Sequence, residues 1–253
     1  LKTGEIKAVW IACTNPAQSL PNQAAVREAL RAAEYVVLQE THGNTDTADY
    51  ADLLLPASGW GEKHGTVTNS ERCITRVRPA VPPPGEARHD WQIVVDFARR
   101  LGRKLDHAGV DRLFPYDDAE AIFNEHRETT RGRDLDITGL SYALLERDGP
   151  QQWPYPEGAG AGKVRLYEDG RFPTADGRAR FVAVEHQPTA DVPNAELPIS
   201  LLSGRLRDHW HGMSRTGAVP RLFNLEDEPL LAMHPCDMRH RNLESGDLAR
   251  VSN

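Results

Sequence analysis

Polar side chains follow a short apolar run near the start of the chain. Val36, Val37 and Leu38 form this run, and Gln39 and Glu40 come directly after it. A short run rich in β-branched residues predicts a buried strand, which would carry Glu40 at its carboxyl end. Ligands of open α/β sheets bind at this edge, where a carboxylate can accept hydrogen bonds from ribose hydroxyls.

A second apolar run, residues 53–55, is closed by Pro56 and leads into a stretch rich in glycine and charge. We interpret the two runs as short strands that feed one polar loop system over residues 56–72. Four charged residues gather in this loop system: Glu62, Lys63, Glu71 and Arg72.

A strand, a loop and a helix precede the first run. Residues 8–12 predict a strand, residues 13–21 a loop, and Asn22 the cap of a helix with apolar residues at helical spacing. With the Val36 strand they form a βαβ unit and predict a mostly parallel α/β sheet. The loop lacks G-x-G-x-x-G, which argues against a nicotinamide fingerprint. Asn15 precedes a proline, so it is either a turn residue or a ligand contact.

The stretch from residue 40 to residue 72 also carries a series of short motifs. They are Glu40-Thr41, Thr45, Ala48, Ala51-Asp52, Leu55-Pro56, Glu62-Lys63, Gly65-Thr66, Asn69 and Glu71-Arg72. This series resembles the signature of molybdopterin-dependent oxidoreductases, and most closely their assimilatory nitrate reductase branch. The alternative is a surface loop of an ordinary α/β domain whose charges are only solvated.

The resemblance implies a cleft for molybdopterin guanine dinucleotide, with Asn15, Gln39, Glu40, Lys63 and Asp90 among its lining residues. It implies that Asp90 accepts two hydrogen bonds from a guanine edge and that Lys63 pairs with the nucleotide. From the residues alone, Asp90 is equally the N-cap of a helix over residues 91–101 that Gly102 would stop, and Lys63 is equally an exposed lysine.

Beyond a proline-rich stretch over residues 188–198, residues 199–202 predict a strand that ends in a polar and aromatic loop. Its two histidines, at i and i+2, have no third ligand at a usable spacing, so we predict no metal site there. The resemblance implies instead that this loop begins a β-barrel domain and wraps a pterin. Its residues are Ser203, Gly204, Arg205, Leu206, Arg207, Asp208, His209, Trp210, His211 and Gly212. Gly212 stands where relatives usually have a hydroxyl residue, and Cys73 where an arginine is usual.

Composition limits the classes of function. The chain has 253 residues and a formal charge of -7, which argues against a nucleic-acid partner. No apolar run approaches the roughly 20 residues of a membrane span. The three cysteines form no Cys-x-x-Cys pair and predict no zinc or iron–sulfur site in this chain. We expect them to be small buried hydrophobes in the reducing cytoplasm.

We therefore predict an α/β fold with three parts: a dinucleotide-binding-like domain over 1–102, an irregular α/β region over 103–194 and an incomplete C-terminal β-barrel over 195–253. The start at Leu1 and the end after a strand-like run suggest a fragment. The resemblance implies molybdenum bis(molybdopterin guanine dinucleotide) as cofactor, with a 4Fe-4S cluster and the molybdenum ligand in a missing N-terminal part. We name no catalytic residue and expect the fragment alone to be inactive.

The resemblance further implies a cytoplasmic enzyme that reduces nitrate to nitrite, with an electron donor protein or reductase subunit as its partner. Formate dehydrogenase of the same family is the main alternative, and a non-catalytic binding module of similar fold is another. Only phrases within residues 136–181 favour nitrate, and these can equally be packing loops.

Overall fold

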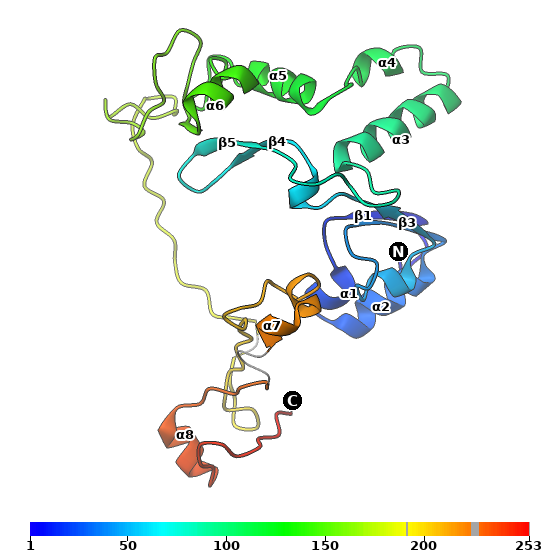
Figure 1. Ribbon diagram of the computed structural model, residues 1–253. Coiled ribbons are helices and arrows are strands. Elements are labelled where there is room, and N and C mark those ends of the chain that lie inside the picture. The colour runs from blue at the N-terminus through cyan, green and yellow to red at the C-terminus, as the bar shows by residue number, and fades with distance from the viewer. Residues whose placement is uncertain (191, 224–227, 253) are drawn as a thin grey trace. The chain divides into compact units, whose positions relative to one another are not determined.

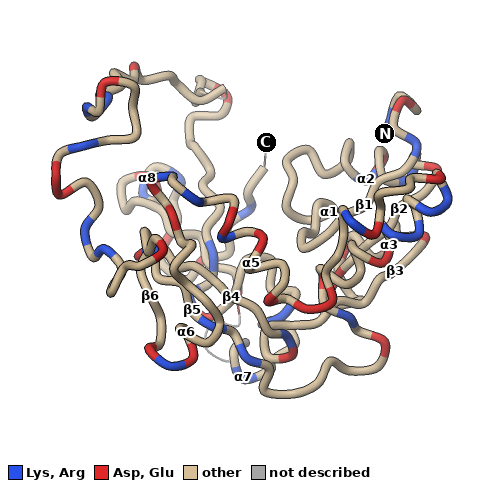
Figure 2. The backbone as a smooth tube through the Cα atoms, turned by 90° about the horizontal axis from the view of Figure 1, so that it is seen from above, with Lys and Arg blue, Asp and Glu red and all other residues tan. Residues whose placement is uncertain are grey.

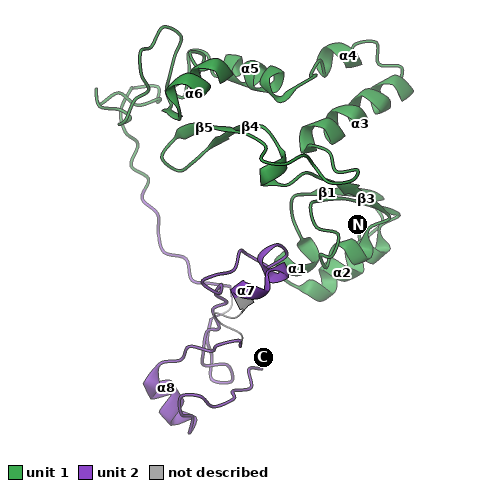
Figure 3. Cartoon of the chain, viewed as in Figure 1, with its two compact units in different colours: residues 1–182 green, residues 183–253 purple. Residues whose placement is uncertain are grey.

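The computed structural model describes residues 1–190, 192–223 and 228–252. The chain forms two compact units, unit 1 over Leu1–Val182 and unit 2 over Ala183–Asn253 (Figure 3). The units divide inside the predicted connecting region 103–194, and the predicted domain boundaries stay predictions. Figure 2 shows lysine and arginine interspersed with aspartate and glutamate in both units.

A three-stranded parallel sheet begins unit 1, as predicted. Its strands β1 (Ala8–Ala12), β2 (Tyr35–Glu40) and β3 (Leu53–Pro56) lie in that order, with β2 between the other two. Because all three strands run the same way, their carboxyl ends meet at one edge of the sheet. The βαβ prediction for residues 8–40 is confirmed.

Helices cover both faces of this sheet. Figure 1 shows α1 (Pro16–Ser19) and α2 (Gln23–Ala32) on one face and α3 (Asp90–Lys104) on the other. The side chain of Asn22 accepts a hydrogen bond from the Ala25 amide, which confirms the predicted cap of α2.

The core under α1 and α2 is small and fully apolar. Its buried members are Ile11, Ala17, Leu30, Val36 and Leu38. Leu38 is 0% exposed, and full burial of such a side chain stabilises a fold by about 1.5 to 3 kcal/mol. The strand that carries Gln39 and Glu40 is therefore fixed by packing on its buried face.

A second sheet takes in one part of the predicted polar loop system over residues 56–72, the strand β4. Strands β4 (Gly65–Thr68), β5 (Cys73–Val77) and β6 (Gln151–Gln152) are antiparallel, with β5 in the middle. The loop prediction was wrong at β4 alone, because the glycines and charges outweighed a β-branched pattern that is present in both strands of this hairpin. A second core packs against it: Ile74, Phe123, Ile137, Leu140, Tyr142, Leu145 and Tyr155.

The remaining helices of unit 1 are α4 (Val110–Leu113), α5 (Ala119–Thr129) and α6 (Tyr142–Asp148). Asp118 caps α5 by accepting a hydrogen bond from the Ala121 amide. The prediction that Gly102 stops α3 was wrong, since the helix continues to Lys104. A Cβ at Gly102 would lie 2.3 Å from a Val110 methyl group, so this glycine serves the close approach of α3 and α4 rather than a helix end.

Unit 2 contains α7 (Pro220–Phe223) and α8 (Pro235–His240). Short 3-10 turns lie at η1 (Ala48–Tyr50) and η2 (Trp60–Glu62) in unit 1 and at η3 (Thr216–Ala218) in unit 2. The strand predicted over residues 199–202 is not formed. A strand needs a neighbour for its backbone groups, and none of the described residues of unit 2 supplies one; Leu202 is 89% exposed. The β-barrel therefore stays a prediction.

None of the helices in the described ranges is long and apolar enough to cross a bilayer.

Candidate functional site

The Asp90 carboxylate joins three segments of unit 1. Its Oδ1 accepts a hydrogen bond from Gln39 Nε2 at 2.8 Å, and its Oδ2 accepts one from Lys63 Nζ, also at 2.8 Å. The thiol of Cys13 lies 3.9 Å from Oδ1, a weak contact. Gln39 is 2% exposed, whereas the side chains of Lys63 and Asp90 are 30% and 33% exposed. The structure thus brings together three residues that the sequence placed in one cleft.

The sheet edge and α3 position this cluster. Gln39 lies in β2 next to its carboxyl end, and the Cys13 amide, just past β1, donates to the Gln39 carbonyl. Asp90 is the first residue of α3, and His89 is the N-cap. The alternative of Asp90 as the N-cap is therefore wrong, and its oxygens bind side chains from other segments instead.

The charge of the cluster follows from its contacts. Burial raises the pKa of the Asp90 carboxyl, but the hydrogen bonds from Lys63 and Gln39 outweigh burial, so this pKa lies below its ordinary value. Burial raises the pKa of the Cys13 thiol, and the negative charge of Asp90 raises it further. At neutral pH the site thus holds an ionised carboxylate beside a neutral thiol.

Two histidines and a serine lie beside Asp90. Ser58 Oγ and His89 Nδ1 are 2.8 Å apart, and the His64 ring meets the His89 ring edge-on at 5.4 Å. Burial lowers the pKa of His89, and the nearby His64 and Lys63 lower it further, so its imidazole is neutral at pH 7. These contacts tie Ser58 and His64 to His89 at the N-terminus of α3.

Asn15 and Glu40 lie at the same sheet edge but have other partners. Asn15 Oδ1 accepts from the Thr47 amide at 3.1 Å and from Thr47 Oγ1 at 2.6 Å, and its Nδ2 donates to Gln18. The Asn15 side chain thereby ties the loop after β1 to the segment after β2. Glu40, half-buried at the end of β2, accepts from the next amide, that of Thr41, at 2.7 Å.

Sequence reasoning missed several residues of this region. Thr47 is completely buried, and its contact with Asn15 spans 32 positions, which no local pattern signals. Ser58 and His89 were missed for the same reason. The expectation that the three cysteines are buried hydrophobes was wrong: Cys13 and Cys236 are exposed and Cys73 is half-buried. Cys13 adopts a positive φ of 60° directly after β1.

The loop over residues 203–212 belongs to unit 2, and several of its side chains make local contacts. The Trp210 amide donates a hydrogen bond to Thr216 Oγ1 at 3.1 Å, and His209 Nδ1 forms a hydrogen bond with the same oxygen at 3.1 Å. His209 is 8% exposed. Arg205 and His211 are 3.5 Å apart, and Arg207 pairs with Asp208 at 3.4 Å. In the described residues no three His, Cys, Asp or Glu side chains are grouped as metal ligands.

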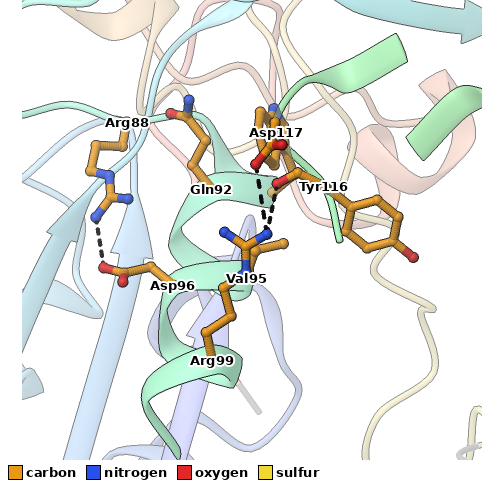
Figure 4. A pocket seen from close by; sticks show the side chains of 8 residues that line it. Arg88, Gln92, Val95, Asp96, Arg99, Tyr116 and Asp117 are labelled. Atoms are coloured by element: carbon orange, nitrogen blue, oxygen red, sulfur yellow. Dashed lines mark hydrogen bonds and ion pairs between the residues drawn. The ribbon is translucent and has the colours of Figure 1, made fainter. Parts of the chain in front are cut away.

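A shallow pocket of about 270 Å³ lies along α3 (Figure 4). Its charged groups form ion pairs with one another or hydrogen bonds with backbone carbonyls. Arg99 donates to the Phe114 and Tyr116 carbonyls at 2.9 and 3.3 Å, and Arg88 pairs with Asp96 at 3.1 Å. We therefore assign this pocket a structural role, the attachment of α3 to residues 114–117.

Comparison with known proteins identifies the family. Residues 1–100 match the family model described as "Molybdopterin oxidoreductase", and residues 199–253 match the one described as "Molydopterin dinucleotide binding domain". The first match contains the whole Asp90 cluster, and the second contains the loop over residues 203–212. The two matches together cover more than half of the chain.

Individual relatives agree with this assignment. A nitrate reductase of Klebsiella oxytoca is 42% identical over 98% of this chain, and the assimilatory nitrate reductase catalytic subunit of Bacillus subtilis is 36% identical over 99%. The F420-dependent formate dehydrogenase subunit alpha of Methanocaldococcus jannaschii is 35% identical over 97%. The chain spans only 28%, 34% and 34% of the lengths of these relatives.

A solved structure shares the fold. Acetylene hydratase from Pelobacter acetylenicus superposes with a TM-score of 0.66 at 19% identity, over 95% of this chain and 33% of that one. The mixed α/β fold with a parallel sheet, the two family matches and the relatives lead to one conclusion: this chain belongs to the molybdopterin oxidoreductase family.

Proposed function

We propose that this chain binds molybdopterin guanine dinucleotide and is part of a molybdenum enzyme that reduces nitrate to nitrite. The observation that carries the proposal is the Asp90 carboxylate, which stands ionised and one-third exposed at the carboxyl edge of a parallel sheet. This edge is where α/β sheets bind nucleotides.

The Asp90 cluster fits a guanine base. Guanine presents two adjacent N–H donors, and a carboxylate presents two acceptor oxygens at a matching separation. Lys63 and Gln39 each take one lone pair, one on either oxygen, which leaves acceptor capacity on both. The thiol of Cys13 is a weak donor that a ligand N–H can displace.

The other residues of the proposed site have supporting roles. Glu40 would accept hydrogen bonds from ribose hydroxyls, and Lys63 would add positive charge next to the nucleotide. Asn15 would hold the loop after β1 in place through its bonds to Thr47. In unit 2 the loop over residues 203–212 would bind a pterin through its backbone and its arginine and histidine side chains.

Molybdenum, when bound, supplies the two-electron chemistry, and the protein supplies binding, orientation and electrostatics. We propose that a 4Fe-4S cluster and an electron donor protein or reductase subunit deliver the electrons, outside this chain. The 36% identity to an assimilatory enzyme favours nitrate assimilation and a cytoplasmic location. The 35% identity to a formate dehydrogenase makes formate oxidation the second candidate.

Binding of GDP to the 253-residue chain tests the site. An Asp90→Ala variant should bind GDP about 5- to 150-fold more weakly in calorimetry, because about 1 to 3 kcal/mol of hydrogen bonding is lost. Asp96→Ala is the matched control, since Asp96 lies in the same helix but pairs with Arg88 and Arg100. Absence of GDP binding by the unmodified chain would contradict the proposal.

The reaction is tested in a polypeptide of the relatives' length that contains this chain. It should contain molybdenum and pterin and reduce nitrate with reduced viologen as donor. Oxidation of formate with a dye acceptor, without nitrate turnover, would favour the second candidate. A protein that retains neither molybdenum nor pterin would be a non-catalytic module.

A further inference from the structure

Gln39 is an unusual residue for its position. It is 2% exposed in the central strand of the sheet, between the fully buried Leu38 and the half-buried Glu40. Its Nε2 donates to Asp90 at 2.8 Å, but no donor in the described residues reaches its buried Oε1. An unsatisfied buried acceptor is unfavourable, so it offsets the stabilisation that the hydrogen bond to Asp90 provides.

The orientation of the Gln39 amide is fixed by its neighbour. Exchanging the amide oxygen and nitrogen would turn an oxygen toward the ionised Asp90 carboxylate, which has no proton to donate at neutral pH. The nitrogen must therefore face Asp90, and the oxygen must face away from it. Satisfying Asp90 leaves Oε1 without a partner.

The two donors on Asp90 come from separate segments. Gln39 holds Oδ1 from the core side of β2, and Lys63 holds Oδ2 from the loop before β4. A carboxylate that is held at both oxygens cannot rotate freely about its terminal torsion, which is otherwise broad. This matters for guanine, because two parallel hydrogen bonds form only when the carboxylate and the base share a plane.

Resting on the proposed function, we infer that Gln39 is a positioning residue: its buried amide sets the plane of the Asp90 carboxylate for two-point recognition of guanine. The role explains why an amide, rather than an aliphatic residue, lies beside Leu38 in the core strand. It also predicts that one substitution changes base selection while leaving stability nearly unchanged.

The test compares GDP with IDP, whose base lacks the 2-amino group, in the 253-residue chain and in Gln39→Met. The unmodified chain should prefer GDP over IDP about tenfold, the value of one hydrogen bond of about 1.4 kcal/mol. In Gln39→Met we expect this ratio to fall toward one. The melting temperature should change little, because removal of the unpaired buried acceptor offsets loss of the hydrogen bond to Asp90.

Three possible results would contradict either the positioning role of Gln39 or the proposed function. Gln39→Met with an unchanged GDP-to-IDP ratio would overturn the positioning role while leaving the guanine site intact. A lower melting temperature with equal weakening of GDP, IDP and ADP would also overturn it, since this is the behaviour of a residue needed only for folding. No binding of GDP to the unmodified chain would contradict the proposed function itself. Gln23→Met, a partly buried glutamine in α2, is the matched control and should leave the ratio unchanged.

Discussion

The two regions that match molybdopterin family models are built differently. Around Asp90, hydrogen bonds join residues that lie 51 and 27 positions apart, and a packed strand carries one of the partners. In the loop over residues 203–212 the contacts of Arg205, Arg207 and Trp210 given above span at most six positions. The first arrangement depends on tertiary packing, and the second depends on local turns. A site on rigid elements holds its groups more accurately than a site on a loop.

The largest expected effect comes from breaking the packing that only the first region has. Leu38→Ala removes a completely buried side chain from β2 and should lower the free energy of unfolding by about 2 to 5 kcal/mol. Leu202→Ala, at a position 89% exposed next to the loop of unit 2, should change it by less than about 0.5 kcal/mol. Urea unfolding followed by circular dichroism measures both, and equal losses would remove the contrast between the regions.

A smaller effect should come from the charges. Lys63→Met removes one partner of Asp90 and should cost about 1 kcal/mol at pH 7, whereas Arg205→Met in the unit 2 loop should change stability by less than about 0.5 kcal/mol.

The effect of Lys63→Met should also depend on pH. The folded-state pKa of Asp90 lies below its ordinary value of 3.8, so its contribution is present above that value and is lost as the pH falls through the folded pKa. The difference between the unmodified chain and Lys63→Met should therefore vanish in acid. A difference that persists below the folded pKa would show that Lys63 stabilises by packing alone.

The smallest effect concerns thiol reactivity. Because burial and Asp90 raise the pKa of Cys13, its alkylation by iodoacetamide at pH 7.5 should be slower than that of free cysteine, and Asp90→Asn should accelerate it. Cys236, an exposed thiol of unit 2, is the internal control. Mass spectrometry of the labelled peptides gives both rates. Equal acceleration at both cysteines would indicate unfolding rather than loss of the Asp90 charge.

The sequence predicted the local parts of the fold well. The strand over residues 8–12, the cap at Asn22 and the parallel pairing followed from periodicity and capping chemistry, which act over a few residues. Gly102 was misjudged because its neighbour is Val110, a tertiary contact that overrides the usual role of glycine near a helix end.

The candidate site was predicted in part. Gln39, Lys63 and Asp90 were placed in one cleft, but through resemblance rather than through any pattern of spacing. Thr47 and Ser58 escaped notice because their partners lie 32 and 31 positions away. In unit 2 the strand over residues 199–202 was predicted from apolar content, yet an apolar run forms a strand only beside another strand.

Backbone hydrogen bonds join residues 56–58 to Arg88, two residues before Asp90. The Ser58 amide donates to the Arg88 carbonyl at 2.9 Å, the Arg88 amide donates to the Pro56 carbonyl at 3.1 Å, and Ala57 and Arg88 form a parallel bridge. The hairpin of β4 and β5 therefore leaves and returns to the chain at one closed point. Its far end is held by other contacts: Arg72 donates to the Lys163 and Val164 carbonyls at 3.1 and 2.7 Å, and Ile74 is buried in the second core. A change in hairpin length should therefore disturb the second core before it displaces the Asp90 carboxylate.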